Sequence, residues 1–114
     1  MTESSGTVFE QLLAIMARLR GSDGCPWDRE QTRASLKPFL IEEAYEVLEA
    51  IDAGDDQALV EELGDLLFQV VFHAQIGAET DAFEMKDILQ HLCEKMTRRH
   101  PHVFSDTRLE TAQA

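Results

Sequence analysis

The feature that most constrains the fold of this chain is a pair of long apolar runs with helical spacing, separated by Gly54. In both runs apolar residues recur every three or four positions, the period of one face of an α-helix. The first run contains Phe39, Leu40, Ala44, Val47, Leu48 and Ile51, and the second contains Leu59, Leu63, Leu66, Leu67, Val70, Val71 and Ala74. We predict a helix over 36–53 and a second one from its N-cap, Asp55, to about Gly77. A connection this short makes the two helices antiparallel neighbours.

Shorter helices are predicted on both sides of this hairpin. The first covers 8–20 and opens at Thr7 with the spacing of a capping box. The last opens with a similar pair, Asp81 and Glu84, and ends before Pro101. Strand-like alternation and internal repeats are absent from the sequence. The predicted fold class is therefore all-α, with antiparallel helical hairpins in a four-helix-bundle-like arrangement.

The segment 21–28 joins the first helix to the hairpin and contains two glycines and a proline, which end helices. We predict an ordered loop here, in which Trp27 either anchors the loop in the core or stays available to a ligand. The two cysteines, Cys25 and Cys93, have no CxxC spacing, and no apolar leader or spanning run accompanies them. Free thiols predict a cytoplasmic location, and the apolar helical stripe around Cys93 predicts that this residue is buried.

Composition excludes several classes of partner. The 114 residues suffice for one domain, near the size at which helical proteins commonly gain stability by oligomerising. Ten Lys and Arg against 22 Asp and Glu leave a formal charge of -12, which repels nucleic acid and anionic membranes. The sequence therefore predicts no nucleic acid polymer and no membrane as partner. A phosphorylated ligand would need a bridging cation or a local basic patch.

Each helix of the predicted hairpin carries two carboxylates three residues apart, which places them on one helix face. The pairs are Glu43 with Glu46 and Glu62 with Asp65. Glu43 and Asp65 are equally far from Gly54 along the chain, as are Glu46 and Glu62, so the antiparallel hairpin sets these acids level with each other. Four carboxylates beside an apolar stripe repel one another, and a hard divalent cation relieves the repulsion. All-oxygen ligands favour Mg²⁺ or Mn²⁺ over Zn²⁺.

Two other interpretations of these acids stay open on spacing alone. They can be the solvated faces of surface helices in an acidic protein. They can also hold two iron ions, although neither cluster has the Glu-x-x-His spacing of such sites. His73 follows Asp65 on the same helix, but its apolar neighbours favour a hydrogen-bonded core or interface histidine over a metal ligand.

Five sequence blocks, in this order and spacing, resemble the MazG family. They are 24–32 (GCPWDREQT), 35–36 (SL), 42–46 (EEAYE), 61–65 (EELGD) and 98–104 (RRHPHVF). The resemblance extends from about Phe9 to Asp106. It predicts one MazG domain at 7–106, followed by a polar C-terminal tail at 107–114.

The resemblance implies an all-α fold whose helical bundle is completed by a second subunit, giving a homodimer or homotetramer. It also implies that Mg²⁺, or Mn²⁺, is held by the acids that match the family motif, which here are Glu43, Glu46, Glu62 and Asp65. MazG enzymes hydrolyse nucleoside triphosphates between the α and β phosphates, releasing a nucleoside monophosphate and pyrophosphate, and so clear unwanted nucleotides. The predicted activity is that of a nucleoside triphosphate pyrophosphatase.

Further residues are candidates for the chemistry around such a metal. Glu42, next to the matched ligands, is a candidate for orienting or deprotonating the attacking water, or else is a solvated carboxylate. The predicted substrate-binding residues are Trp27, Lys95, Arg98, Arg99 and His100. Lys95 and Arg99 are four residues apart on one helix face and suit a phosphate group, while Trp27 offers a ring for stacking on a base.

Many MazG proteins carry two such domains in tandem, and this chain resembles the first copy. The alternative to an enzyme is therefore a noncatalytic MazG-like module for oligomerisation or nucleotide binding. All four matching acids are present, which favours activity.

Overall fold

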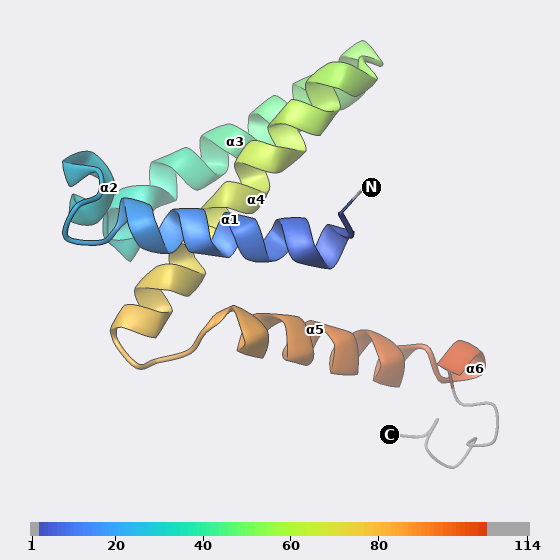
Figure 1. Ribbon diagram of the computed structural model, residues 1–114. Helices are drawn as coiled ribbons and strands as arrows, with labels where there is room; N and C mark the ends of the chain where they lie inside the picture. The colour runs from blue at the N-terminus through green and yellow to red at the C-terminus, as the bar shows by residue number, and fades with distance from the viewer. Residues whose placement is uncertain (1–2, 105–114) are drawn as a thin grey trace.

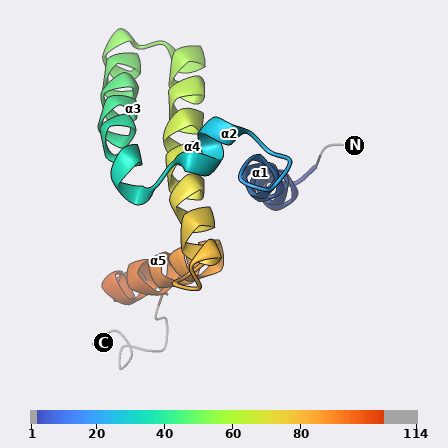
Figure 2. The same ribbon diagram turned by 90° about the vertical axis from the view of Figure 1, so that its left-hand side faces the viewer.

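The computed structural model describes residues 3–104, and every regular element in that range is a helix, which confirms the predicted all-α class. The elements in chain order are α1 (Ser5–Leu19), α2 (Pro26–Glu30), α3 (Arg33–Ala53), α4 (Asp56–Glu79), α5 (Met85–Arg99) and α6 (Pro101–Phe104). α3 and α4 form the hairpin, α1 crosses α4, and α5 leaves from the opposite end of α4 (Figure 1). Figure 2 shows that α1 and α5 lie apart from the tip of the hairpin. The predicted tail at 107–114 lies outside the described residues.

The hairpin is closed by the two residues that the sequence singled out. Gly54 ends α3 with a φ of 67°, in the left-handed region that glycine adopts without steric cost. Its amide donates to the carbonyl oxygens of Ala50 and Ile51. The Asp55 carboxylate accepts a hydrogen bond of 3.1 Å from the amide of Ala58 and caps α4, as predicted.

The other predicted helix starts were wrong by about one turn. α1 begins at Ser5 because the Ser4 hydroxyl accepts from the amide of Thr7, so Thr7 lies inside the first turn rather than at the cap. α3 begins at Arg33 rather than at 36 because Thr32 and Ser35 form a reciprocal capping box, each hydroxyl accepting from the other residue's amide. Short hydroxyl side chains at successive turns made more than one cap possible in the sequence.

The turn between α4 and α5 also differs from the prediction. Asp81 does not cap α5 but occupies the turn with a φ of 57°. Glu84 is the N-cap instead, and the Asp87 carboxylate accepts from its amide at 2.9 Å. Phe83 lies against Gly77, where an added Cβ would be 2.8 Å from the ring. The absence of a side chain at Gly77 therefore allows the turn to pack on α4.

The segment predicted as a loop at 21–28 contains the start of the short helix α2, and α6 was likewise not predicted. Pro26 opens α2, a position where its missing amide hydrogen costs nothing. Gly24 passes so close to the end of α1 that a Cβ would collide with the carbonyl oxygen of Leu19. The Trp27 side chain is 52% exposed and meets Phe39 edge to face, with ring centroids 5.8 Å apart. Trp27 is therefore not a core anchor.

The hydrophobic core lies where α1 crosses α4 near the start of α3. Its buried residues are Met16, Leu36, Val71, Phe72 and Ile76, and Phe9, Leu12, Leu13 and Phe68 pack around them. Cys93 is exposed, contrary to the prediction, because no other described element covers its face of α5. Among the described residues no helix combines the length and apolar character needed to cross a bilayer.

Arg20, at the end of α1, joins three parts of the chain. Its Nε and Nη2 donate to the two carboxylate oxygens of Glu79 on α4, at 2.9 and 2.7 Å. Its Nη1 donates to the carbonyl oxygens of Asp28 and Gln31, at 2.7 and 3.1 Å. The guanidinium carbon lies 5.5 Å from the ring centre of Phe72, which is a cation–π arrangement. The Arg20 side chain is only 8% exposed, so this bidentate ion pair is shielded from water on one side.

The Arg20–Glu79 pair predicts a specific pH dependence of stability. Hydrogen bonding to Arg20 lowers the pKa of Glu79 below its usual 4.5, although burial acts in the opposite direction. A lowered folded-state pKa stabilises the protein above the unfolded-state pKa, and this stabilisation is lost as the pH falls through the folded-state value. Glu79→Gln should therefore reduce the free energy of unfolding by about 1–2 kcal/mol at pH 7. The reduction should shrink below about pH 4.

Urea unfolding at one protein concentration, at pH 7 and pH 3.5, measures this difference. Glu94→Gln, on exposed α5, is the matched control and should change stability little at either pH. A Glu79→Gln effect of equal size at both pH values would contradict the role of the ion pair.

Candidate metal centre

The hairpin brings three carboxylates together near the middle of α3 and α4. One oxygen each of Glu43, Glu62 and Asp65 lies within 4.8 Å of the other two. Glu43 and Glu62 are half-buried, and Asp65 is exposed. We call these three residues the acidic cluster. Because α3 contributes one member and α4 two, the antiparallel register set at Gly54 is what assembles the cluster.

The pKa values of Glu43 and Glu62 are both raised, so ionising these two carboxyl groups is unfavourable. Burial raises the pKa of Glu43, and the neighbouring charge of Asp65 raises it next most strongly. Burial also raises the pKa of Glu62, followed by the charge of Glu46. The strongest charge neighbours are thus Asp65 for Glu43 and Glu46 for Glu62, which is the level pairing that the hairpin symmetry predicted. A bound cation would reverse these shifts, because opposite charge favours the ionised carboxylate.

One carboxylate oxygen of the cluster is buried without a hydrogen-bond partner in the described part of the chain. Glu43 Oε1 is buried and has no hydrogen-bond partner among the described residues. Buried polar atoms are nearly always paired, and an unpaired carboxylate oxygen is among the more costly exceptions. Mg²⁺ and Mn²⁺ are hard cations that take carboxylate oxygens as ligands, so the cluster fits such an ion.

The other predicted acids lie at the edge of this cluster. Glu46 is exposed and is not one of the three residues whose oxygens converge, although its charge acts on Glu62. Glu42 is exposed as well, and its charge acts on Glu43. Both therefore lie close enough to influence the cluster, and their roles as ligand and base stay predictions.

Histidine does not take part in the acidic cluster, in agreement with the sequence interpretation of His73. The ring of His73 is half-buried on α4, and its pKa is lowered by burial and, to a smaller extent, by the charge of Arg33. A neutral imidazole is favoured there. Two features that define di-iron sites, a histidine ligand and the Glu-x-x-His spacing, are thus missing from the cluster.

The predicted substrate-binding residues fall into two groups. Trp27 meets Phe39, which lies one helical turn before Glu43 on α3. The second group, Lys95, Arg98, Arg99 and His100, lies on and after the end of α5. α5 runs beneath the hairpin in both views (Figures 1 and 2), and in Figure 1 its C-terminal end points away from the start of α3. Within residues 3–104 the ion pair found is Arg20–Glu79, so these cations do not pair with the cluster in one protomer.

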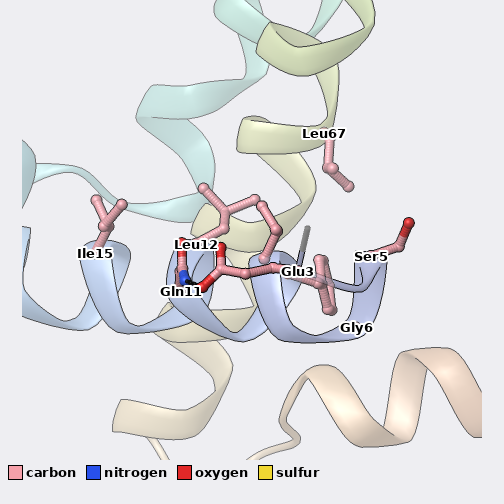
Figure 3. Close-up of a pocket in the computed structure, with 9 residues that line it drawn as sticks. Glu3, Ser5, Gly6, Gln11, Leu12, Ile15 and Leu67 are labelled. Carbon is pink, nitrogen blue, oxygen red and sulfur yellow. Dashed lines mark hydrogen bonds between the residues drawn. The ribbon is translucent and has the colours of Figure 1, made fainter. Parts of the chain in front are cut away.

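An apolar groove of about 850 Å³ runs along α1 beside Leu67 of α4 (Figure 3). Val8, Phe9, Leu12 and Ile15 supply most of its apolar lining, and a hydrogen bond from Gln11 to Glu3 lies at its edge. Leu67 follows Asp65 by two residues, which turns it about 200° around the helix from that acid. The groove is therefore separate from the acidic cluster.

Fold and cluster together define an all-α protein whose central helical hairpin carries three convergent carboxylates, two of them half-buried. A sequence model of the MazG nucleotide pyrophosphohydrolase domain matches residues 31–104, which include α3, α4 and the acidic cluster. The chain belongs to the MazG nucleotide pyrophosphohydrolase domain family.

Individual relatives agree with this assignment. The chain is 56% identical, over 92% of its length, to the nucleoside triphosphate pyrophosphohydrolase/pyrophosphatase MazG of Thermotoga maritima. It is 52% identical, over 91% of its length, to the nucleoside triphosphate pyrophosphohydrolase of Escherichia coli K12. The uncharacterized protein YabN of Bacillus subtilis is 51% identical over 90% of the chain. The matches cover 41%, 40% and 21% of these relatives, so the chain spans well under half of each of them.

The orphaned oxygen and the raised pKa values predict how the protein responds to a divalent cation. A ligand that binds only the folded state stabilises it by about 2.7 kcal/mol when its concentration is 100 times Kd. Thermal unfolding in EDTA and in excess Mg²⁺ or Mn²⁺ should therefore show a cation-dependent rise in Tm for the wild type. Glu43→Gln should lose most of that rise, whereas Asp52→Asn, exposed on the same helix, should keep it.

The metal-free measurement provides a second readout. The raised pKa of Glu43 means that its charge lowers stability at pH values above the folded-state pKa. In EDTA at pH 7, Glu43→Gln should therefore unfold at a higher temperature than the wild type. An unaltered cation response in Glu43→Gln would count against the cluster as the binding site.

Proposed function

We propose that this protein is a metal-dependent nucleoside triphosphate pyrophosphohydrolase that releases a nucleoside monophosphate and pyrophosphate. In this reaction a water oxygen forms a bond to the α phosphorus, and the bond from that phosphorus to the α–β bridging oxygen breaks. The observation that carries the proposal is the acidic cluster, with the unpaired Glu43 Oε1, on a MazG-family hairpin. The names of the Thermotoga maritima and Escherichia coli relatives support the same activity.

Glu43, Glu46, Glu62 and Asp65 are the proposed ligands for Mg²⁺, with Mn²⁺ as a substitute. When bound, such an ion supplies charge neutralisation at the phosphates and acidifies a coordinated water. In the protein itself the hairpin brings Glu43, Glu62 and Asp65 together and half-buries Glu43 and Glu62. That arrangement lets a protein with a formal charge of -12 bind a triphosphate through a cation rather than through a broadly basic surface.

Glu42 is the proposed acceptor of the proton from the attacking water. It directly precedes Glu43, is exposed to solvent, and lies close enough to raise the pKa of Glu43. A carboxylate at the edge of the cluster can therefore hold a water or receive its proton without acting as a ligand. Glutamine at this position would keep a hydrogen-bond acceptor but lose the basic carboxylate.

The proposed contacts to the nucleotide come from two parts of the chain, α2 and the end of α5. Trp27 is exposed, so we propose that its ring stacks on the base of the nucleotide. Such stacking accepts any of the bases. Lys95 and Arg99, assisted by Arg98 and His100, are proposed to bind the β and γ phosphates. Since these cations form no ion pair with the cluster among the described residues of one protomer, the proposal is compatible with α5 from a second protomer meeting the cluster.

A noncatalytic module is the second candidate. The observation in its favour is that the chain matches only part of each named relative. The chain spans about two fifths of the two named pyrophosphohydrolases, so the activity of those proteins can reside outside the matched part. Such a module would bind nucleotide or a second subunit without turnover. The unpaired Glu43 oxygen favours the enzyme. A buried carboxylate oxygen without a partner destabilises the folded protein, and a helix with a purely structural role would not require one.

Product analysis distinguishes the two candidates. The protein is incubated with individual NTPs and dNTPs plus Mg²⁺, and monophosphate and pyrophosphate are quantified by ion-exchange chromatography. We expect both products in equal amounts, a loss of about 100-fold or more in kcat for Glu43→Gln, and an unchanged rate for Asp52→Asn. Orthophosphate as the first product, or no turnover by correctly folded wild-type protein, would reject the proposed reaction.

We also propose that the working protein is a homo-oligomer, a dimer or a tetramer, assembled through the hairpin. The chain has a radius of gyration of 17.4 Å. A compact domain of about 100 residues has a radius of gyration of only about 13 Å. Large apolar side chains on the hairpin stay exposed, among them Ile41, Tyr45, Leu48, Ile51, Val60 and Leu63. Exposed apolar surface on this scale marks an interaction face, and the commonest solution is a two-fold contact with another copy.

The two cysteines bear on where the protein works. Cys25 and Cys93 are both free in the structure. Free thiols persist in a reducing compartment, so we propose a location in the cytoplasm.

Light scattering tests the oligomer. Wild-type protein should have at least twice the protomer mass of 12.9 kDa, and Leu48→Glu should shift the population towards the protomer because it places a charge in an apolar contact. Gln57→Glu adds the same charge at an exposed position near the hairpin tip and should leave the mass unchanged. A monodisperse wild-type monomer would reject this proposal.

A further inference from the structure

The short helix α2 lacks the features that usually hold a helix in place. It has five residues, none of them buried, and no side-chain hydrogen bond at its N-cap, Cys25. Helices this short are not stable by themselves. Something outside α2 must therefore fix its orientation, and with it the direction of the Trp27 ring.

Arg20 supplies that constraint at the C-terminal end of α2. Its Nη1 binds the carbonyl oxygens of Asp28 and Gln31, which bracket the last turn. The Gln31 side chain in turn donates to the Trp27 carbonyl at 3.0 Å. Arg20 thus fixes the backbone next to Trp27 directly at Asp28, and it binds the residue, Gln31, whose side chain holds the Trp27 carbonyl.

Glu79 fixes the orientation of Arg20 itself. Two parallel hydrogen bonds between a guanidinium and a carboxylate define a plane, which one ammonium group cannot do. Gln75 donates to Glu79 at 3.1 Å and holds the carboxylate from the other side. The plane of Arg20 is therefore set by α4, the helix that also carries Glu62 and Asp65.

We propose that Arg20, oriented by Glu79, is a positioning residue that aligns Trp27 with the acidic cluster for nucleotide binding. The connection runs from α4 through Glu79 and Arg20 to the carbonyl groups of α2, and it ends at an exposed ring packed on Phe39, one turn from Glu43. α4 thus fixes both the position of Trp27, through Glu79 and Arg20, and the positions of the cluster members Glu62 and Asp65. This inference rests on the proposed function, because it assigns Trp27 a contact with the nucleotide.

The protein contains one tryptophan, so Trp27 reports directly on α2. The test compares wild type with Arg20→Lys and Glu79→Gln, using acrylamide quenching of Trp27 without nucleotide and steady-state kinetics with an NTP and Mg²⁺. Arg29→Lys is the control, because Arg29 also binds one carbonyl of the same segment, that of Ser22, but does not touch Glu79. We expect both test variants to increase quenching and to raise KM by about tenfold, the scale of one lost base stack, with little change in kcat.

A double-mutant cycle separates positioning from general damage. Trp27→Ala should raise KM by a similar factor, and adding Arg20→Lys to it should raise KM no further, since both changes remove the same contact. Independent, multiplying effects would overturn the inference, as would unchanged quenching and KM in folded Arg20→Lys and Glu79→Gln. If Arg20→Lys fails to fold by circular dichroism, Glu79→Gln provides the same comparison with Arg20 intact.

The proposed function can fail separately. An unchanged KM in Trp27→Ala would show that the ring does not contact the nucleotide and would overturn the link to binding. Absence of turnover by the wild type would reject the reaction, and the decisive readout would then be quenching of Trp27 by a nucleotide with Mg²⁺. Arg20→Lys must weaken that quenching for the inference to stand.

Discussion

The register between α3 and α4 is the constraint on which the rest of the structure depends. It is set by the left-handed turn at Gly54 and by the Asp55 cap that starts α4 immediately afterwards. A shift of one residue would rotate each acid by about 100° and separate Glu43 from Asp65. The core at the α1 crossing and the acidic cluster are both built on this one pairing, so a change at the turn would affect folding and metal binding together.

The cluster opposes the stability of the hairpin that carries it. Burial and mutual repulsion raise the pKa of Glu43 and Glu62, and one oxygen of Glu43 has no partner among the described residues. Neutral residues in these places would pack without that cost. Retaining an unfavourable group at a convergent, partly open position is a common property of functional sites, where a ligand completes the interactions. The Arg20–Glu79 pair differs from it, because each of its charges is already satisfied within the protein.

Much of this arrangement could be predicted from the sequence, because the informative signals are local. The periodicity of apolar residues predicted the long helices, and Gly54 with Asp55 predicted the turn. The equal sequence separations of the acids from Gly54 predicted their level pairing. The helix starts predicted at 8 and 36 were wrong because several hydroxyl residues can cap, and only the three-dimensional packing selects one. The burial predicted for Cys93 was wrong because an apolar stripe does not reveal whether a neighbouring element covers it. Arg20 could not be identified at all, since its partner Glu79 is remote in sequence and carries no motif.

The contact between Phe83 and Gly77 determines where the basic end of the molecule can go. Glycine inside a helix costs about 0.5–1 kcal/mol relative to alanine, yet at this position it leaves the space that the Phe83 ring occupies. Arg33, at the start of α3, also lies over that ring, 5.3 Å from its centre. The direction of α5 is therefore set by a missing methyl group on α4 and a cation from the first turn of α3. Lys95 and Arg99 lie at the far end of α5, so a small rotation about this aromatic ring becomes a large displacement of the cations.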